Sequence, residues 1–481
     1  MRWTAKIHSL VFVSAAVLWC LPLGGAQKGW IELIRGVGLS AWRRPTGEWL
    51  EVGSVALDPK NDRRFAWREG KGVLVNGRRG RTVNLVSKLE HADCEAHVEF
   101  VVPRGSNSGV YFMGRYEIQI LDSWDASRNA PKRKVGFGDC GGIYQRWVNG
   151  RGFEGRPPRV NACRPPGKWQ AYDVVFQAPR FDSSGKKTAN AKFLRVVHNG
   201  ILIHEDEEVS GPTRAAMFND EKPTGPLMLQ GDHGPVAYRN IRIRLLPEYD
   251  ARKLVPDELL ARVASYDWTG DRKPLAGLEE NVRSLPLTAI RLVEERLLLV
   301  LKDPKASVPG KRFVLKLLRR IGSKACVPVV ARYLTDPVLS HMARLTLQGL
   351  PYGEVDAALH QALGKADYRQ KIGIITTLAD RGDRNAASLL APLAASRNRE
   401  LAEAAISALG RIGGPEAAAV LLKLEVPRTL RDALGEALLS CASSLKRKRK
   451  GDLLESILQR IRSGPFSERI KEAAGRLPLC R

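Results

Sequence analysis

The chain has 481 residues, 44% of them hydrophobic, and a formal net charge of +26 at neutral pH. This length predicts two to four domains, each large enough to bury a core, and the composition excludes a disordered chain. The charge favours anionic partners without choosing between acidic glycans, nucleic acid and an anionic surface. Nuclease activity is disfavoured because the sequence lacks paired acidic or His-rich metal motifs.

The first 26 residues have the features of a cleaved secretory signal. Arg2 and Lys6 precede an apolar run, Leu10–Leu23, and the small residues Gly24–Ala26 stand before Gln27. A run of about 14 apolar residues is short for a membrane span. We therefore expect a secreted or periplasmic protein, with no transmembrane span in the mature chain and no nucleic-acid partner.

Removal of this signal leaves six cysteines of the seven in the sequence. None has the paired CxxC spacing of a zinc site. In an oxidising compartment Cys140 and Cys163 could form a disulfide across a loop, and free buried thiols explain the sequence equally well.

Residues 27–247 have the pattern of a β-domain, with short alternating runs separated by turns. Asn199-Gly200 lies between two such runs and predicts a tight hairpin. A long Gly-, Pro- and Arg-rich stretch, Ser123–Pro166, has few strand signals and should either cover a site or be mobile. Its aromatic residues Tyr144, Trp147 and Phe153 could stack on sugar rings or pin the loop to the domain.

The chain changes to helical periodicity after a charged, partly helical connector at residues 248–285. From residue 286 to 481, turn glycines recur at intervals of 31, 29 and 31 residues, and an alanine follows each one by three or four positions. The pattern resembles short HEAT repeats of the phycobilisome-lyase-like class, which stack into an α-solenoid. This resemblance implies a region that docks a protein partner. The glycines and alanines are Gly322, Gly353, Gly382, Gly413, Ala325, Ala357, Ala386 and Ala417.

The stretch Gly114–Trp124, GRYEIQILDSW, predicts a strand with polar groups on one face. Alternation places Tyr116 and Ile118 on an apolar face, and Glu117 and Gln119 on the opposite face.

Together with this strand, a set of motifs in a fixed order resembles the 3-keto-disaccharide hydrolase family, also called 3-keto-glucoside lyase/hydratase. The resemblance covers about Gly29–Pro247 and implies an all-β, concanavalin-like jelly-roll sandwich that acts on oxidised sugars. The motifs are NSG at Asn107–Gly109, YEIQILD at Tyr116–Asp122, GGIY at Gly141–Tyr144, GKW at Gly167–Trp169, LQGDHG at Leu229–Gly234 and YRNI at Tyr238–Ile241.

A 3-keto-glycoside can be cleaved by removing the C2 hydrogen and expelling the C1 oxygen, which requires a base, an acid and an electrophile. The resemblance points to Glu117, Asp122 and His233 as catalytic candidates. A divalent metal held by Glu117 and His233 is an alternative electrophile. Substrate-binding candidates are Asn107, Gln119, Tyr144, Trp147, Gln230 and Arg239.

Each of these candidates also has a structural explanation, such as a turn or a strand-edge contact. The same fold also serves in non-catalytic glycan-binding modules, so a glycan-binding sandwich on a docking solenoid is the rival hypothesis.

Overall fold

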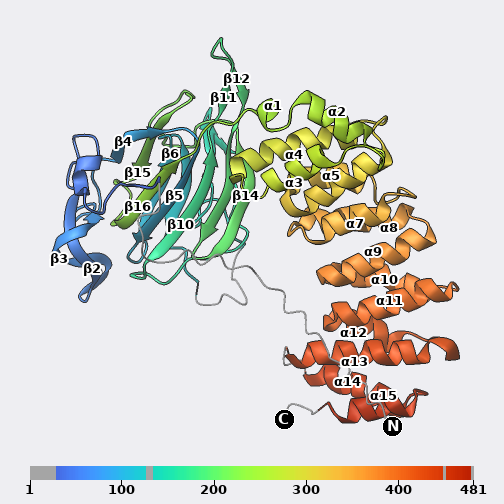
Figure 1. Ribbon diagram of the computed structural model, residues 1–481. Helices are drawn as coiled ribbons and strands as arrows, with labels where there is room; N and C mark the ends of the chain where they lie inside the picture. Colours follow the sequence, from blue (N-terminus) through green and yellow to red (C-terminus); the bar gives the residue numbers. More distant parts are fainter. Residues whose placement is uncertain (1–28, 126–133, 448–450, 478–481) are drawn as a thin grey trace, which may run out of the picture. The chain divides into compact units, whose positions relative to one another are not determined.

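The computed structural model describes residues 29–125, 134–447 and 451–477. Two antiparallel β-sheets precede an all-helical region, which confirms the expected class of a β-sandwich followed by helices (Figure 1). The predicted signal at residues 1–26 and Cys480 lie outside the described residues. No helix in the described part of the chain has the length and apolar character needed to cross a membrane.

The larger sheet has the strand order β14-β13-β10-β5-β16-β3-β2, and β1 pairs with β16 outside this path. Its strands are β1 (Ile31–Glu32), β2 (Leu50–Asp58), β3 (Asn61–Val75), β5 (Cys94–Val101), β10 (Gln170–Gln177), β13 (Ala191–His198), β14 (Ile201–Val209) and β16 (Ala237–Leu245). Asn199-Gly200 joins β13 to β14, and both residues have positive φ, as the predicted hairpin requires.

The smaller sheet has the order β4-β15-β6-β7. Its strands are β4 (Leu85–His91), β6 (Asn107–Phe112), β7 (Tyr116–Leu121) and β15 (Gly225–Leu229). Two short hairpins complete the β-region, β8 (Arg146–Val148) with β9 (Arg151–Phe153) and β11 (Arg180–Phe181) with β12 (Lys187–Ala189).

The two sheets face each other across a core of alternating side chains. Ser108 on β6 and Tyr238 on β16 share a hydrogen bond of 2.8 Å between their hydroxyls, so the side chains of both strands meet in the core between the sheets. Ile118 and Ile120 of β7 are fully buried, as the alternation predicts. Glu117 and Gln119, on the other face of β7, are buried as well. A second layer of residues must therefore cover the outer face of the small sheet.

The helical region shares one continuous core that extends from Val255 to Ala474. Gly382 ends α9 in the left-handed conformation with φ of 68°, which explains the choice of glycine at this repeat boundary. The helices are α1 (Ala251–Leu254), α2 (Asp257–Ser265), α3 (Lys273–Asn281), α4 (Leu287–Lys302), α5 (Val308–Ile321), α6 (Val327–Ala331), α7 (Ser340–Gln348), α8 (Gly353–Lys365), α9 (Tyr368–Arg381), α10 (Ala387–Ala394), α11 (Arg399–Ile412), α12 (Gly414–Lys423), α13 (Arg431–Arg447), α14 (Gly451–Ser463) and α15 (Glu468–Gly475).

The chain forms two compact units. The first unit contains the chain up to Val174, together with His198–Ile201 and Pro212–Leu246. The second unit contains Val175–Val197, Leu202–Gly211 and the chain from Pro247 onward. The second unit thus includes most of β13 and β14 beside the helices. Helices α2 and α3 of the predicted connector contribute buried residues to the helical core, and Leu254 of α1 packs against it. The expected domain boundaries at 247 and 285 stay predictions.

Candidate active site

The candidate site is built on the paired strands β6 and β7. Tyr111 lies opposite Glu117 and Gly109 lies opposite Gln119, with Asn107 two residues further along β6. Side chains directly opposite each other in an antiparallel pair lie on the same face. The motifs NSG and YEIQILD therefore place Asn107, Tyr111, Glu117 and Gln119 together on the outer face of the small sheet.

Glu117 is a carboxyl group on this face whose pKa is shifted far from its usual value. Its side chain is 2% exposed, and burial raises its pKa to about 8. The negative charge of Asp232 raises this pKa further, whereas a hydrogen bond from the Tyr111 hydroxyl opposes the shift. A carboxyl group with a pKa near neutrality can both accept and donate a proton under physiological conditions.

Gln119 lies two residues after Glu117, at the next position on the same face of β7, and binds the Glu117 carboxyl. In the orientation that satisfies both amide atoms, Gln119 Nε2 donates to the Ser108 carbonyl at 2.8 Å and to Glu117 Oε1 at 3.0 Å. The Gln119 backbone is fixed in turn by the Tyr172 hydroxyl, which donates to its carbonyl at 2.7 Å. The amide thus orients one carboxyl oxygen of Glu117.

Gly109 provides the space in which the Glu117 carboxyl lies. A Cβ atom at this position would come within 2.2 Å of Glu117 Oε1. Such a contact is impossible without displacing the carboxyl group, so the glycine of the NSG motif has a steric role rather than a conformational one.

Asn107 and Gln230 border the same face. Asn107 Oδ1 is buried and has no hydrogen-bond partner among the residues that the structure describes, which is unusual for a buried acceptor and leaves it available for a hydroxyl donor. Gln230 is buried, and its backbone amide donates to the Gly109 carbonyl at 2.9 Å. The extension of β15 thus continues the sheet beside Gly109.

The loop after Gln230 forms the rim of the site. Asn76 Nδ2 donates to the carbonyls of Gly231 and Gly234 at 3.0 and 2.7 Å, which fixes both ends of the loop. Gly234 packs against the Asn107 backbone so closely that a Cβ atom would lie 3.0 Å from its nitrogen. Asp232 and His233 between these glycines are half exposed.

Asp232 and His233 form a hydrogen-bonded pair, with Asp232 Oδ1 2.6 Å from His233 Nδ1. This bond favours the tautomer in which Nδ1 carries hydrogen and Nε2 is an acceptor. The effect of Asp232 on the pKa values of Glu117 and Tyr111 shows that the pair lies within electrostatic reach of the buried carboxyl.

The GGIY motif extends the small sheet beyond β7. Ile143 forms a bridge with Ile118, and the backbone amide of Tyr144 donates to the Glu117 carbonyl at 3.2 Å. Tyr144 packs edge-on against Phe137. Trp147 is exposed, and the Arg214 guanidinium lies 4.1 Å from its ring centroid. The described part of the predicted loop thus continues the sheet beside Glu117 and presents three exposed aromatic residues, Trp124, Trp147 and Phe153.

The structure does not group Asp122 and Arg239 with Glu117. Asp122 Oδ2 accepts a hydrogen bond from the Gly105 amide at 2.9 Å, which is a turn contact. Arg239 lies on the outer face of the large sheet, where it pairs with Glu99 at 2.7 Å and stacks over Trp169. Tyr238 points into the core, so strand alternation directs Arg239 away from the small sheet.

Three residues of the site were not identified from the sequence. Tyr111 is two positions after Gly109 and therefore lies on the same face of β6, so the alternation of the strand could have identified it. Asp232 stood in the LQGDHG motif beside His233. Thr213, whose hydroxyl accepts a hydrogen bond from the Glu117 amide at 3.1 Å, comes from a distant loop without any sequence signal.

The residues present do not form a metal-binding set. Across the described ranges, no three or more His, Cys, Asp or Glu side chains are grouped so that they could hold a metal ion. The alternative in which Glu117 and His233 bind a metal therefore has no third ligand of these types among the described residues.

The described cysteines are free thiols. Cys140 and Cys163 are buried and hydrogen-bonded to each other, and Cys140 Sγ lies 3.2 Å from the Tyr172 hydroxyl that supports Gln119. The two cysteines are thus neighbours across the loop, and a disulfide between them stays a prediction.

The comparisons with known proteins agree with this geometry. Residues 29–244 match the 3-keto-alpha-glucoside-1,2-lyase-like domain family. Residues 355–439 of the helical region match HEAT repeats. Both resemblances inferred from the motifs are thereby confirmed.

Two solved structures from Parabacteroides distasonis ATCC 8503, both provisionally assigned as glycosyl hydrolases, are similar to the chain. One is 28% identical with a TM-score of 0.32, and covers 46% of this chain and 84% of its own. The other is 20% identical with a TM-score of 0.29, and covers 45% of this chain and 99% of its own. No curated protein matches the sequence.

The pKa of Glu117 in the lyase-like domain predicts how stability depends on pH. The folded state keeps a proton up to about pH 8, whereas the unfolded chain releases it near pH 4.5. The free energy of unfolding should therefore fall as pH rises between these values, by at most about 1.4 kcal/mol per pH unit. Glu117→Gln removes the titrating group and should flatten this slope.

Urea unfolding of both proteins across this pH range measures the difference. Identical slopes for the wild type and Glu117→Gln would show that the carboxyl keeps an ordinary pKa in the folded protein.

Proposed function

We propose that this carbohydrate-active protein is a lyase or hydrolase of 3-keto-glycosides, with Glu117 as the base. The observation that carries the proposal is the buried Glu117 carboxyl with a pKa of about 8, on the strand that bears the family motif. An ordinary carboxylate is a weak base for a carbon acid, and a higher pKa makes the ionised form a stronger one.

The proposed reaction begins at the C2 hydrogen of the sugar, which the neighbouring C3 ketone acidifies. Glu117 takes this proton, the C1–O bond breaks, and doubly protonated His233 donates its Nε2 proton to the departing oxygen, which leaves as an alcohol. Water then adds across the resulting C1–C2 double bond and releases the free 3-keto sugar. Each step uses general acid–base chemistry alone.

The polar residues around Glu117 have positioning roles in this proposal. Asn107 Oδ1, which is buried without a partner, accepts a hydrogen bond from a sugar hydroxyl. Gln119 holds the carboxyl in place, and Trp147 offers an exposed ring for a sugar face.

A non-catalytic glycan-binding sandwich is the second candidate, because Trp147 is exposed beside a buried polar face as in a sugar-binding surface. One assay separates the two. The full chain is incubated with a 3-keto-glucoside, with and without a chelator, and free 3-keto-glucose or the enone is measured. Saturable sugar binding without product under every metal condition would contradict the enzyme and support the binding module.

We further propose that the protein is exported and that its helical region docks a protein partner. The support for export is the signal-like sequence before Gln27. Mass spectrometry of the native protein should find a mature N-terminus at or near Gln27. Intact Met1 in a cytoplasmic fraction would contradict export.

A further inference from the structure

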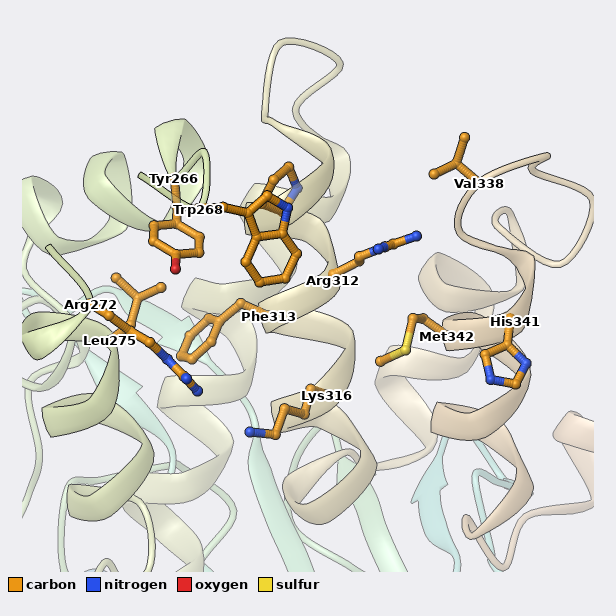
Figure 2. A pocket seen from close by; sticks show the side chains of 11 residues that line it. Tyr266, Trp268, Arg272, Leu275, Arg312, Phe313, Lys316, Val338, His341 and Met342 are labelled. Atoms are coloured by element: carbon orange, nitrogen blue, oxygen red, sulfur yellow. The ribbon is translucent and has the colours of Figure 1, made fainter. Parts of the chain in front are cut away.

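A pocket of about 430 Å³ lies in the helical region, outside the residues that match HEAT repeats (Figure 2). It is lined by the segment between α2 and α3, by α5, and by the start of α7. This volume is within the range of pockets that bind small molecules or single side chains.

The pocket has an apolar interior. Leu275 of α3, Phe313 of α5 and Met342 of α7 line it from three sides, and Tyr266 and Trp268 close it from the segment before α3. Met adapts to the shape of an inserted group, and aromatic rings supply large contact areas. The interior therefore suits a bulky apolar group.

Positive charge surrounds this interior. Arg272, Arg312 and Lys316 line the pocket, and no Asp or Glu is among its lining residues. Glu279 pairs with Lys316 at 2.8 Å and with Arg272 at 3.8 Å. Arg312 forms no ion pair within the part of the chain that the structure describes, and its Nε is buried without a hydrogen-bond partner. One guanidinium at the pocket is thus left to bind an anion.

Trp268 stands at the rim in a fixed position. Its side chain is 62% exposed, and its ring packs edge-on against Tyr266. The loop that carries it is held by Asp267 Oδ1, which accepts hydrogen bonds from the amides of Thr269 and Gly270 at 3.0 and 3.1 Å. An exposed, ordered Trp beside Arg and Met is the composition of an interface centre.

We propose that this pocket binds an acidic peptide segment of a partner protein, which inserts one bulky apolar side chain and places a carboxylate on Arg312. The inference rests on the docking role proposed for the helical region. Trp268 and Val338 line the pocket and are also exposed, so apolar surface continues outside the cavity. We therefore expect a ligand that extends beyond the cavity, as a polypeptide does.

The lining disfavours an anionic glycan as the occupant. Sugar hydroxyls are usually bound by several neutral and acidic hydrogen-bonding side chains. Here only Tyr266 and His341 are of the neutral kind, and the lining has no Asn, Gln, Asp or Glu. The high net positive charge of the chain also steers acidic segments toward it at low salt.

Fluorescence anisotropy with the full chain tests the proposal. The probe is a short labelled peptide in which one Phe is flanked by Asp and Glu, and the comparison peptides replace the Phe with Ala or the acids with Lys. We expect saturable binding of the first peptide alone, weakened by salt. Trp268→Ala and Arg312→Gln should each weaken it by roughly tenfold or more.

Arg320→Gln is the matched control, because Arg320 is exposed on the same helix and does not line the pocket. It should leave the affinity unchanged. Circular dichroism of each variant checks that the helices remain folded.

Three results of the binding assay would overturn the proposal: no binding of the acidic peptide, equal binding by the Trp268→Ala and Arg312→Gln variants, or Trp268-dependent binding of polygalacturonate without peptide binding. The 3-keto-glucoside assay on the same preparation reports separately on the sandwich. Recovery of a partner by Trp268→Ala and Arg312→Gln as well as by the wild type would retain docking while excluding this pocket.

Discussion

Glu117→Gln should reduce the rate of 3-keto-glucoside cleavage by about 10² to 10⁴-fold while the protein stays folded, since such losses are typical when a general base is removed. The substituted amide is nearly the same size as the carboxyl and fits the space left by Gly109. It cannot accept the C2 proton. Steady-state kinetics of the purified variant measure the loss.

The pH profile adds a test that a merely structural role would not pass. As the base, Glu117 must be ionised, so kcat/KM of the wild type should rise with pH through a pKa near 8, and Glu117→Gln should lose this rise. A fall at the same pKa that Glu117→Gln abolishes would assign Glu117 as the acid instead. Glu69→Gln, at an exposed position of β3, is the control and should retain wild-type kinetics.

Arg291→Met should lower the free energy of unfolding of the second unit by about 3 to 5 kcal/mol, the usual cost of breaking a buried ion pair by removing one partner. Arg291 on α4 is 8% exposed and donates to Asp206 at 2.8 Å and to Glu294 at 3.2 Å. Methionine keeps the length of the side chain but leaves these carboxylates without their cation.

Urea unfolding followed by helical circular dichroism measures this loss. The control is Arg469→Met, because the pair of Arg469 with Glu436 is exposed and should contribute little to stability. Adding Asp206→Asn and Glu294→Gln to Arg291→Met should recover part of the stability. If Arg291→Met and Arg469→Met lowered the free energy of unfolding equally, the buried ion pairs of Arg291 would contribute no more to stability than an exposed pair.

The strand phase of the site could be predicted because alternation in β7 is regular. Tyr116 and Ile118 must enter the core, which places Glu117 and Gln119 on the other face, and the register with β6 brings Asn107 and Gly109 beside them. The alternation of residues along β7 was therefore enough to predict which side chains lie at the centre of the site.

The burial of the polar face could not be predicted in the same way. It depends on Thr213 and Tyr144, which come from loops far apart in sequence and reach Glu117 through backbone contacts. Arg239 was grouped with the site because of its motif, although its alternation with Tyr238 directs it to the outer face of the large sheet, away from Glu117. The pocket beside Trp268 was missed because its residues meet only when α3, α5 and α7 pack together.

The near-complete burial of Glu117 has a consequence for the fate of the proton in the proposed reaction. A carboxyl group that is 2% exposed exchanges its proton with bulk water slowly compared with one at the surface. Hydration of the double bond requires a proton at C2, and Glu117 holds the one that it has just removed. Deuterium placed at C2 of the substrate should therefore be partly retained in the 3-keto sugar formed in ordinary water, as mass spectrometry of the product can show, and complete washout would mean that the buried carboxyl equilibrates with solvent between the two steps.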